Sequence, residues 1–104
     1  MSLSNPNSTF EVMLPAKYDE LTSLQRRAVR EQYSRLQHWN CFFCKASLFG
    51  KPIQKVMDAE INWALFPENF TKYPVHLQHD HDTGLTEGAV HALCNAYMWQ
   101  YHRR

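Results

Sequence analysis

The spacing of apolar residues predicts an amphipathic helix that begins at Thr22 or Ser23 and runs to about His38. Either hydroxyl can cap the helix, because its oxygen accepts a hydrogen bond from one of the first free backbone N–H groups. The apolar positions recur at helical intervals and form one broad face: Leu24, Ala28, Val29, Tyr33 and Leu36. The outer side of the helix is basic, because three arginines fall largely away from that face: Arg26, Arg27 and Arg30.

An alternation of apolar and polar residues predicts a strand over residues 74–80. One face carries Val75, Leu77 and His79, and the other carries His76, Gln78 and Asp80. The sequence Asp82-Thr83-Gly84 predicts a turn, after which a second short strand or a loop runs to Gly88. A last helix is expected from about Ala89 to His102, with three polar residues in its first turns: His91, Cys94 and Asn95.

The remaining parts of the chain carry weaker patterns. Residues 1–20 are expected to form an N-terminal arm that is mobile over residues 1–9, and residues 21–104 a single domain. Residues 10–14 are short and mostly apolar, and would pack on this domain or on a partner subunit. Residues 56–66 fit either a strand or a short helix. Four aromatic residues are expected to fill the small core, with base stacking as the alternative: Trp63, Phe66, Phe70 and Tyr73.

The length of 104 residues fits one small α+β domain, and the net charge of +1 does not mark a nucleic-acid binder. Charge is nevertheless unevenly distributed. Residues 22–55 contain one acid, Glu31, and seven basic residues: Arg26, Arg27, Arg30, Arg35, Lys45, Lys51 and Lys55. Residues 58–87 contain six acids and one base, Lys72. This favours a basic surface for phosphates beside a pocket that attracts cations, and two solvated faces of opposite sign are the alternative.

The cysteines predict a zinc site rather than a disulfide framework, because their number, three, is odd. Cys41 and Cys44 have the spacing with which a tight turn binds one metal ion. A redox-active pair has the same spacing, but it would follow a strand, whereas here a helix precedes it. His91 and Cys94 repeat the spacing downstream, which favours zinc and a reducing compartment. No signal peptide is visible in the mostly polar first residues, and no apolar stretch is long enough to cross a membrane.

Residues 76–95 bring imidazoles, carboxylates, a thiol and a carboxamide into one short stretch. A structural core does not require this density, because each such group is costly to bury without a partner. A phosphodiester-cleaving site does require it. Imidazole accepts a proton from water near neutral pH, carboxamide and carboxylate oxygens suit Mg²⁺, and a thiolate suits zinc.

Together with the Cys41/Cys44 pair, this stretch resembles the HNH, or ββα-metal (His-Me finger), nucleases, and within them the phage recombination endonuclease VII group. That group has a CxxC motif, then HxDHxH, then TGxxRGxLCxxCN. The spacing from Thr83 to Asn95 matches without a gap. The resemblance covers residues 41–97, with a longer insert between the cysteine pair and the strand than the family is expected to have. It is carried by His76-Leu77-Gln78-His79-Asp80-His81, Thr83-Gly84, Gly88, Cys94-Asn95, Cys41 and Cys44.

The resemblance implies a zinc-stapled ββα-metal domain with flanking helices. The family's structural zinc ligands match three cysteines: Cys41, Cys44 and Cys94. His91 stands where the family has the remaining cysteine, and three cysteines with one histidine are a common zinc set. His79 matches the general base that deprotonates the attacking water. Asn95 matches the ligand of a catalytic Mg²⁺ or Mn²⁺.

Two positions depart from the family pattern. Gln78 stands where the family has a metal-binding aspartate. Its side-chain oxygen is still expected to bind the catalytic cation together with Asn95, but it carries no charge, so cation affinity should be lower. Glu87 stands where the family has arginine, so one phosphate contact is expected to be missing. Asp80 or Asp82 could return charge to the cation directly or through water. His81 is expected to orient the scissile phosphate or to support the site. His76 is expected to contact the metal ligands from behind rather than bind the cation itself.

The function predicted from these residues is that of a metal-dependent DNA endonuclease or nickase, acting on duplex, branched or nicked DNA. The resemblance permits a homodimer and implies a cytoplasmic protein of a bacterium or a phage-infected cell. The alternative is a non-catalytic, zinc-stapled nucleic-acid-binding module with a degenerate site, which Gln78 and Glu87 favour. A third hypothesis, a purely structural zinc protein, predicts no affinity for nucleic acid even at low salt.

Overall fold

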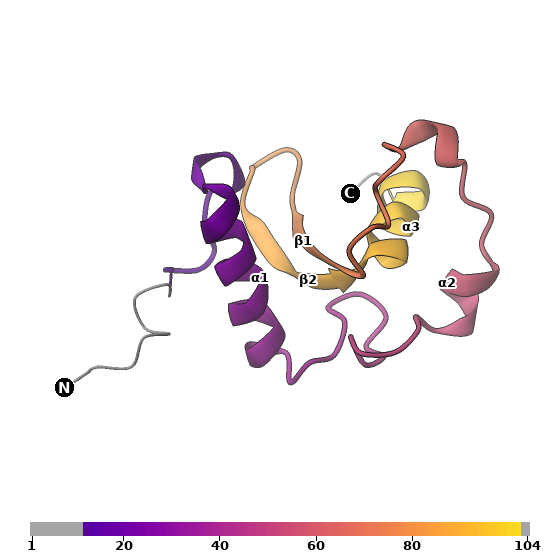
Figure 1. The fold of residues 1–104 in the computed structure, drawn as a ribbon, viewed down its shortest axis with the longest axis horizontal. Helices are drawn as coiled ribbons and strands as arrows, with labels where there is room; N and C mark the ends of the chain where they lie inside the picture. Colours follow the sequence, from indigo (N-terminus) through magenta and orange to yellow (C-terminus); the bar gives the residue numbers. More distant parts are fainter. Residues whose placement is uncertain (1–11, 103–104) are drawn as a thin grey trace.

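A two-stranded antiparallel sheet lies beside two helices in residues 12–102, the part of the chain that the computed structural model describes (Figure 1). The elements follow one another in this order: η2 (Tyr18–Glu20), α1 (Ser23–Leu36), α2 (Gln54–Asp58), η3 (Trp63–Leu65), β1 (Val75–His79), β2 (Thr86–His91) and α3 (Ala92–His102). Helix α1 contacts both strands, and α3 continues directly from β2. The predicted α+β class is confirmed.

Helix α1 begins after Thr22, one of the two caps predicted. The Thr22 hydroxyl accepts a hydrogen bond from the Gln25 backbone N–H at 3.1 Å, and the Gln25 side chain accepts one from the Thr22 N–H at 2.8 Å. This reciprocal pair satisfies two donors that the helix itself leaves free. The helix ends at Leu36, earlier than predicted, because His38 and Trp39 adopt left-handed φ values of 56° and 62°.

The buried face of α1 is narrower than predicted. Val29 and Ser34 are buried, whereas Leu24 and Leu36, near the two ends of the helix, are exposed. A helix of 14 residues is about 21 Å long, and a sheet of two strands is only about 10 Å wide. The ends of α1 therefore extend past the sheet, which covers the middle of the helix.

The β hairpin confirms the predicted strand and turn. Residues pair in register from Val75 with His91 to Gln78 with Gly88, and the register then shifts between Gln78 and His79. The Asp80 carboxylate closes the turn by accepting hydrogen bonds from the backbone N–H groups of residues 82 and 83, at 2.7 and 3.0 Å. Gly84, with a φ of 77°, supplies the left-handed conformation that the turn needs.

The outer edge of β2 is covered by other parts of the chain, so that its backbone groups are paired. The Gln37 side chain imitates a neighbouring strand, because it accepts a hydrogen bond from the Ala89 N–H and donates one to the Ala89 carbonyl, both at 2.9 Å. The Phe42 N–H donates to the same carbonyl at 2.9 Å. Near the start of β2, the Thr86 N–H donates to the Ala16 carbonyl at 2.8 Å. An exposed strand edge is thereby avoided.

This close cover leaves no room for a side chain at Gly88. A Cβ atom there would lie 2.7 Å from both Gln37 Oε1 and Phe42 Cγ. The substitution Gly88→Ala is expected to lower the free energy of unfolding by about 2 kcal/mol through overpacking, as measured by urea denaturation. Gly50→Ala is the control, because its Cβ would meet only Ser47 O, at 3.9 Å. Equal losses in the two variants would contradict this packing argument.

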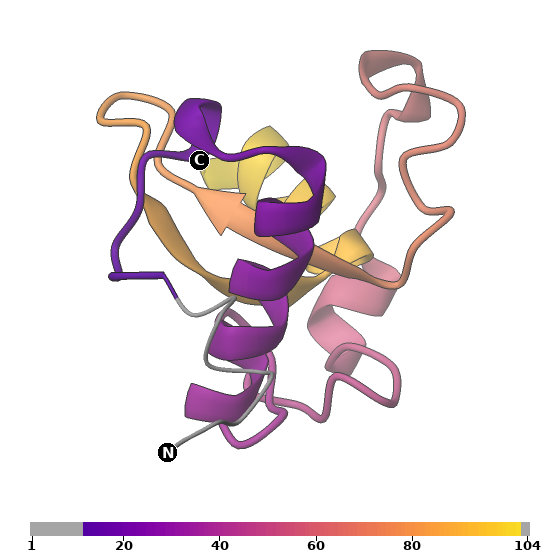
Figure 2. The ribbon, with the colours of Figure 1, turned by 60° about the vertical axis from the view of Figure 1, so that its left-hand side comes forward.

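The aromatic residues predicted to fill the core lie elsewhere. Trp63 and Tyr73 are 46% and 62% exposed, and Phe66 and Phe70 are half-buried. The segment of residues 59–74 contains the short helical turn η3 and no strand, and it runs along the side of the molecule away from α1 (Figure 2). The core lies instead around the cysteines and consists, apart from Tyr97, of small and medium-sized residues. Its buried members are Cys41, Cys44, Leu48, Val56, Ala89, Val90, Cys94, Tyr97 and Met98.

Two further predictions about boundaries are corrected or fall outside the structure. Helix α3 begins at Ala92 rather than Ala89, so that His91 is the last residue of β2 and not a helix residue. The predicted mobility of residues 1–9 lies outside the described residues. The chain from residue 12 onward packs on the domain: the Val12 backbone exchanges two hydrogen bonds with the Gln32 side chain. No helix in the described residues has the length and apolar character needed to cross a membrane.

Candidate metal centre and adjoining cleft

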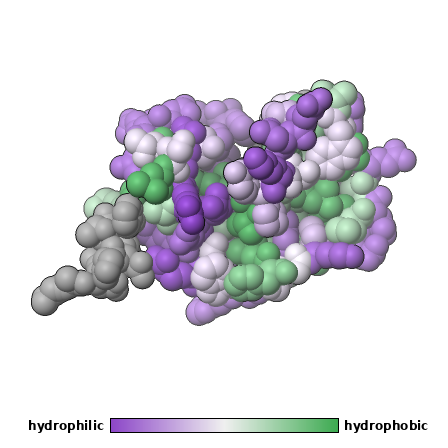
Figure 3. All heavy atoms as spheres, in the orientation of Figure 1, coloured by the Kyte–Doolittle hydropathy of each residue, from purple (hydrophilic) through white to green (hydrophobic). Residues whose placement is uncertain are grey.

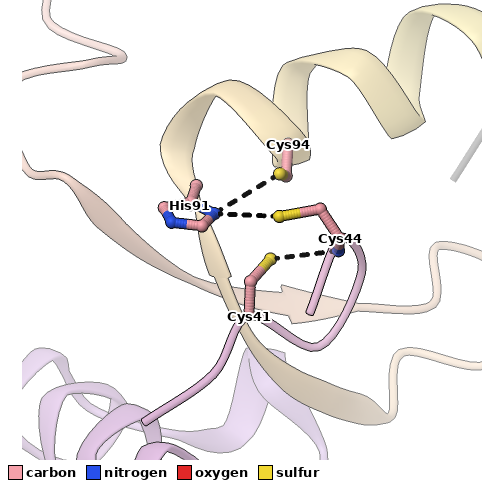
Figure 4. A group of neighbouring side chains, drawn as sticks. All are labelled: Cys41, Cys44, His91 and Cys94. Atoms are coloured by element: carbon pink, nitrogen blue, oxygen red, sulfur yellow. Dashed lines mark hydrogen bonds between the residues drawn. The ribbon is translucent and has the colours of Figure 1, made fainter. Parts of the chain in front are cut away.

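Four predicted zinc ligands converge on one buried point. Their ligand atoms all lie within 4.8 Å of one another, and the side chains point toward a common centre (Figure 4): Cys41, Cys44, His91 and Cys94. A tetrahedral zinc ion with bonds of about 2.1–2.3 Å requires ligand atoms about 3.5–4 Å apart. The arrangement therefore fits one metal ion with little adjustment, and the prediction that these residues can bind a metal is confirmed.

A tight turn positions the first two sulfurs. The Cys44 N–H points at Cys41 Sγ, 3.5 Å away, and the Lys45 N–H donates to the Cys41 carbonyl at 3.0 Å. Lys45 adopts a left-handed φ of 72°, which reverses the chain. The Cys41 N–H then donates to the Ala46 carbonyl at 2.8 Å. This turn holds both thiols on its inner side, where an N–H group also faces a sulfur.

The histidine ligand is oriented by the same loop. His91 Nε2 lies 2.8 Å from the Ser47 carbonyl oxygen, which can only accept a hydrogen bond, so Nε2 carries the proton. The lone pair of Nδ1 therefore faces the sulfurs of Cys44 and Cys94, each 3.5 Å away. A carbonyl behind a ligating imidazole fixes its tautomer in many metal sites. A histidine at this position is thus a competent metal ligand.

The protonation of the sulfurs also suits a cation. A hydrogen bond from the Cys94 thiol lowers the pKa of Cys41 from 9.0 to about 4. The same hydrogen bond, together with burial, raises the pKa of Cys94. Without a cation, Cys41 is therefore favoured as a thiolate and Cys94 as a thiol, and binding of a divalent cation is expected to release the proton of Cys94.

The predicted catalytic residues lie in a separate cleft with a volume of about 600 Å³. It is bounded by α1, β1, α3 and the segment of residues 59–74. Five residues singled out from the sequence line it: His76, Gln78, His79, His81 and Asn95. Two arginines of the predicted basic surface, Arg26 and Arg30, also line the cleft. Tyr18 lines it as well, and sequence reasoning did not connect it to this site because no local pattern relates it to β1.

His79 is held by stacked rings. Its imidazole lies 3.9 Å from the Tyr18 ring, nearly parallel to it, and 4.7 Å from the His81 ring. The Arg26 guanidinium lies 4.0 Å from the centre of the same Tyr18 ring and donates to the Tyr18 carbonyl. Burial lowers the pKa of His79 below 6.5, and the neighbouring His81 lowers it further. The ring is therefore neutral at pH 7 and able to accept a proton.

Asn95 is held by His76. Asn95 Nδ2 can only donate a hydrogen bond, and it donates one to His76 Nδ1 at 3.1 Å. Burial lowers the pKa of His76, so the ring is neutral and Nδ1 can accept this bond. This contact assigns the amide nitrogen of Asn95 to the histidine. The amide oxygen is left as the group with which Asn95 can ligate a cation.

The two positions that depart from the family pattern contact each other. Gln78 is 2% exposed, and its Nε2 donates to the His79 carbonyl at 3.0 Å and to a Glu87 carboxylate oxygen at 3.4 Å. A carboxyl group therefore lies in direct contact with the uncharged side chain of Gln78. The Asp80 carboxylate, considered above as a source of charge, is engaged with the backbone of the turn.

Comparisons of the chain with models of protein families, with curated proteins and with solved structures found no significant match.

Proposed function

We propose that this protein is a metal-dependent DNA endonuclease, in which β1, β2 and α3 form a zinc-stapled ββα-metal domain. One observation carries the proposal: His79, at the end of β1, and Asn95, in the first turn of α3, line the same cleft. The neighbouring Cys94 belongs to the buried cluster. Adjacent residues of α3 thus serve two sites, and a metal bound by the cluster would fix the position of Asn95.

Each residue has a role in this proposal. Cys41, Cys44, His91 and Cys94 would hold zinc, which supplies a rigid connection between the loop after α1, β2 and α3. Asn95 would hold Mg²⁺ or Mn²⁺ through its amide oxygen, and such a cation stabilises the charge that develops on phosphate oxygens. His79 takes the proton from the attacking water.

Two arginines of α1 are suited to hold the phosphates of the substrate. Arg26 and Arg30 both line the cleft, and neither forms an ion pair with a carboxylate within residues 12–102. Arg27, by contrast, points away and pairs with Glu31 at 3.5 Å. Guanidinium groups bind phosphate oxygens by charge-assisted hydrogen bonds. The basic helix therefore contributes phosphate contacts from beside the proposed general base.

A non-catalytic nucleic-acid-binding module is the second candidate, and the contact between Gln78 and Glu87 favours it. Here an uncharged side chain stands at the position of a metal-binding carboxylate, and its amide nitrogen is turned toward Glu87. A binding module would keep the arginines and the zinc cluster and would not need the second cation.

Plasmid nicking separates the two candidates. Zinc-loaded protein is incubated with supercoiled DNA and Mg²⁺ or Mn²⁺, and the formation of open circles is followed on a gel. The endonuclease is expected to nick the plasmid when either cation is present and to leave it intact when both are omitted. If no DNA form is cut with either cation, yet the protein binds DNA, the enzymatic proposal fails and the binding module remains.

The pH profile of nicking tests the state of His79. A general base must be unprotonated, so kcat/KM is expected to fall as the pH falls through the lowered pKa of His79, below 6.5. Replacing His81 with glutamine removes the neighbouring group whose electrostatic effect lowers the pKa of His79. The acid limb of the profile should then move upward, toward 6.5. A wild-type limb above pH 7 would be incompatible with His79 as the base.

A further inference from the structure

The cleft beside His79 has a wall of aromatic rings that the proposed reaction does not use. We define this aromatic wall as Phe66, Phe70 and Trp99, all of which line the cleft. The rings form a continuous series, with centres 4.8 Å apart from Phe66 to Phe70 and 5.9 Å apart from Phe66 to Trp99. Phe70 also meets His76 edge to face at 4.7 Å. The wall therefore reaches the residue that holds Asn95.

These rings are not required by the hydrophobic core. The core lies around the cysteines, whereas Trp99 is exposed and the two phenylalanines are half-buried. On the face of the molecule that Figure 3 shows, hydrophobic residues are exposed between areas of hydrophilic residues. Large aromatic rings that face a cleft of about 600 Å³ are typical of a site for a planar ligand.

Charge identifies the kind of ligand. Arg26 and Arg30 come from α1, and the aromatic wall comes from α3 and the segment of residues 59–74, with β1 between them (Figure 1). A ligand that meets both sides must present a flat ring and a negative group. A nucleotide in a single strand has this form, because its base is free to stack and its phosphate remains exposed. In an intact duplex, the faces of the bases are already covered by their neighbours.

We propose that the cleft binds an unpaired DNA nucleotide, with its base stacked on the aromatic wall and its phosphates on Arg26 and Arg30. The preferred substrate is then DNA with single-stranded character, such as a gap or a flap, rather than intact duplex. This inference rests on the proposed function for the cleavage step and deepens it by naming the substrate class. Binding itself requires neither His79 as a base nor the second cation.

Binding of a labelled oligonucleotide tests the inference. Fluorescence anisotropy is measured with zinc-loaded protein and no Mg²⁺ or Mn²⁺, using one strand alone and the same strand annealed to its complement. The single strand is expected to bind about tenfold more tightly than the duplex. Phe70→Leu and Trp99→Leu keep apolar bulk and remove the flat ring, so each should weaken single-strand binding about five- to tenfold. Neither should change duplex binding more than about twofold.

Phe49→Leu is the matched control. Phe49 is 80% exposed, stacks on Trp39 and does not line this cleft, so its loss should leave both affinities unchanged. Thermal melts establish that each variant is folded. If Phe70→Leu does not fold, Trp99→Leu alone tests the aromatic wall. Duplex binding as tight as single-strand binding, or wild-type affinity in both cleft variants, would overturn the inference.

The same measurements separate this inference from the proposed function. If single-strand binding depends on the aromatic wall but no DNA is nicked, the cleft is supported as a nucleotide-binding site and the proposed nuclease activity is rejected. If DNA is nicked without preference for single strands and Phe70→Leu has no effect, the proposed nuclease activity is supported and the nucleotide-binding site is rejected.

Discussion

Replacing Cys94 with alanine is expected to unfold the domain and to abolish stoichiometric zinc binding. Cys94 joins α3 to the loop of Cys41 and Cys44, and its sulfur is fully buried among the other ligand atoms. Structural zinc contributes about 10 kcal/mol or more to small domains, whereas the whole stability of a domain is about 5–15 kcal/mol. Removal of one ligand should therefore exceed what the small core can offset. Zinc content by mass spectrometry and helix content by circular dichroism measure the two effects.

Val56→Ala is the matched control for this prediction. Val56 is also fully buried in the core but does not contribute to the cluster. Its truncation should lower the free energy of unfolding by about 2 kcal/mol and leave one zinc ion per chain. A strong chelator should unfold the wild type reversibly, with refolding on return of zinc. Retention of wild-type melting in Cys94→Ala, or in the chelated protein, would show that the cluster does not support the fold.

Replacing His79 with alanine is expected to lower the rate of plasmid nicking by about 10²–10⁴-fold, the contribution of a positioned general base. The alanine substitution also removes the stacking of His79 on Tyr18, so the melting temperature and zinc content are measured in parallel to detect any loss of stability. His79→Gln keeps a polar side chain of similar length without a basic group near neutral pH. It should be as inactive as the alanine variant.

His38→Asn is the control for nonspecific effects of removing an imidazole. His38 is exposed, does not line the cleft, and has a positive φ that asparagine tolerates. Its nicking rate should equal that of the wild type. Substantial activity in a folded His79→Gln protein would mean that another group takes the proton, and the assignment of His79 would be withdrawn.

The arginines of α1 illustrate how far sequence reasoning reaches on a helix. Periodicity placed all three outside the buried face, and Arg27 is indeed exposed and paired with Glu31. Arg26 and Arg30 are half-buried and turn toward the cleft. The direction of a helix face is readable from spacing, but what lies beside that face depends on how the helix crosses the sheet. Nothing local to residues 23–36 relates them to His79.

The aromatic residues of the insert illustrate the opposite limit. Large apolar rings are expected in a core, and this expectation was wrong for Trp63 and Tyr73 because the segment pairs with no strand. Apart from Tyr97, the core is built from smaller residues, and the cysteine loop approaches β2 closely. Gly88 permits that approach, and the Gln37 side chain completes it. Neither role could be predicted, because both depend on contacts between residues about fifty positions apart.

The sequence by itself determined the groups whose chemistry is local: the cap of α1, the alternating strand β1, the turn before β2, and the thiols and imidazole able to bind one metal. Spacing suffices for these, because the metal ligands come as two pairs and each pair spans only four residues of the sequence. Only the tertiary structure decided where those pairs meet, which histidine holds Asn95, and which arginines and rings surround His79. These relations depend on contacts between residues far apart in the sequence, such as Asn95 with His76 and Tyr18 with His79, so no single segment contains the information for them.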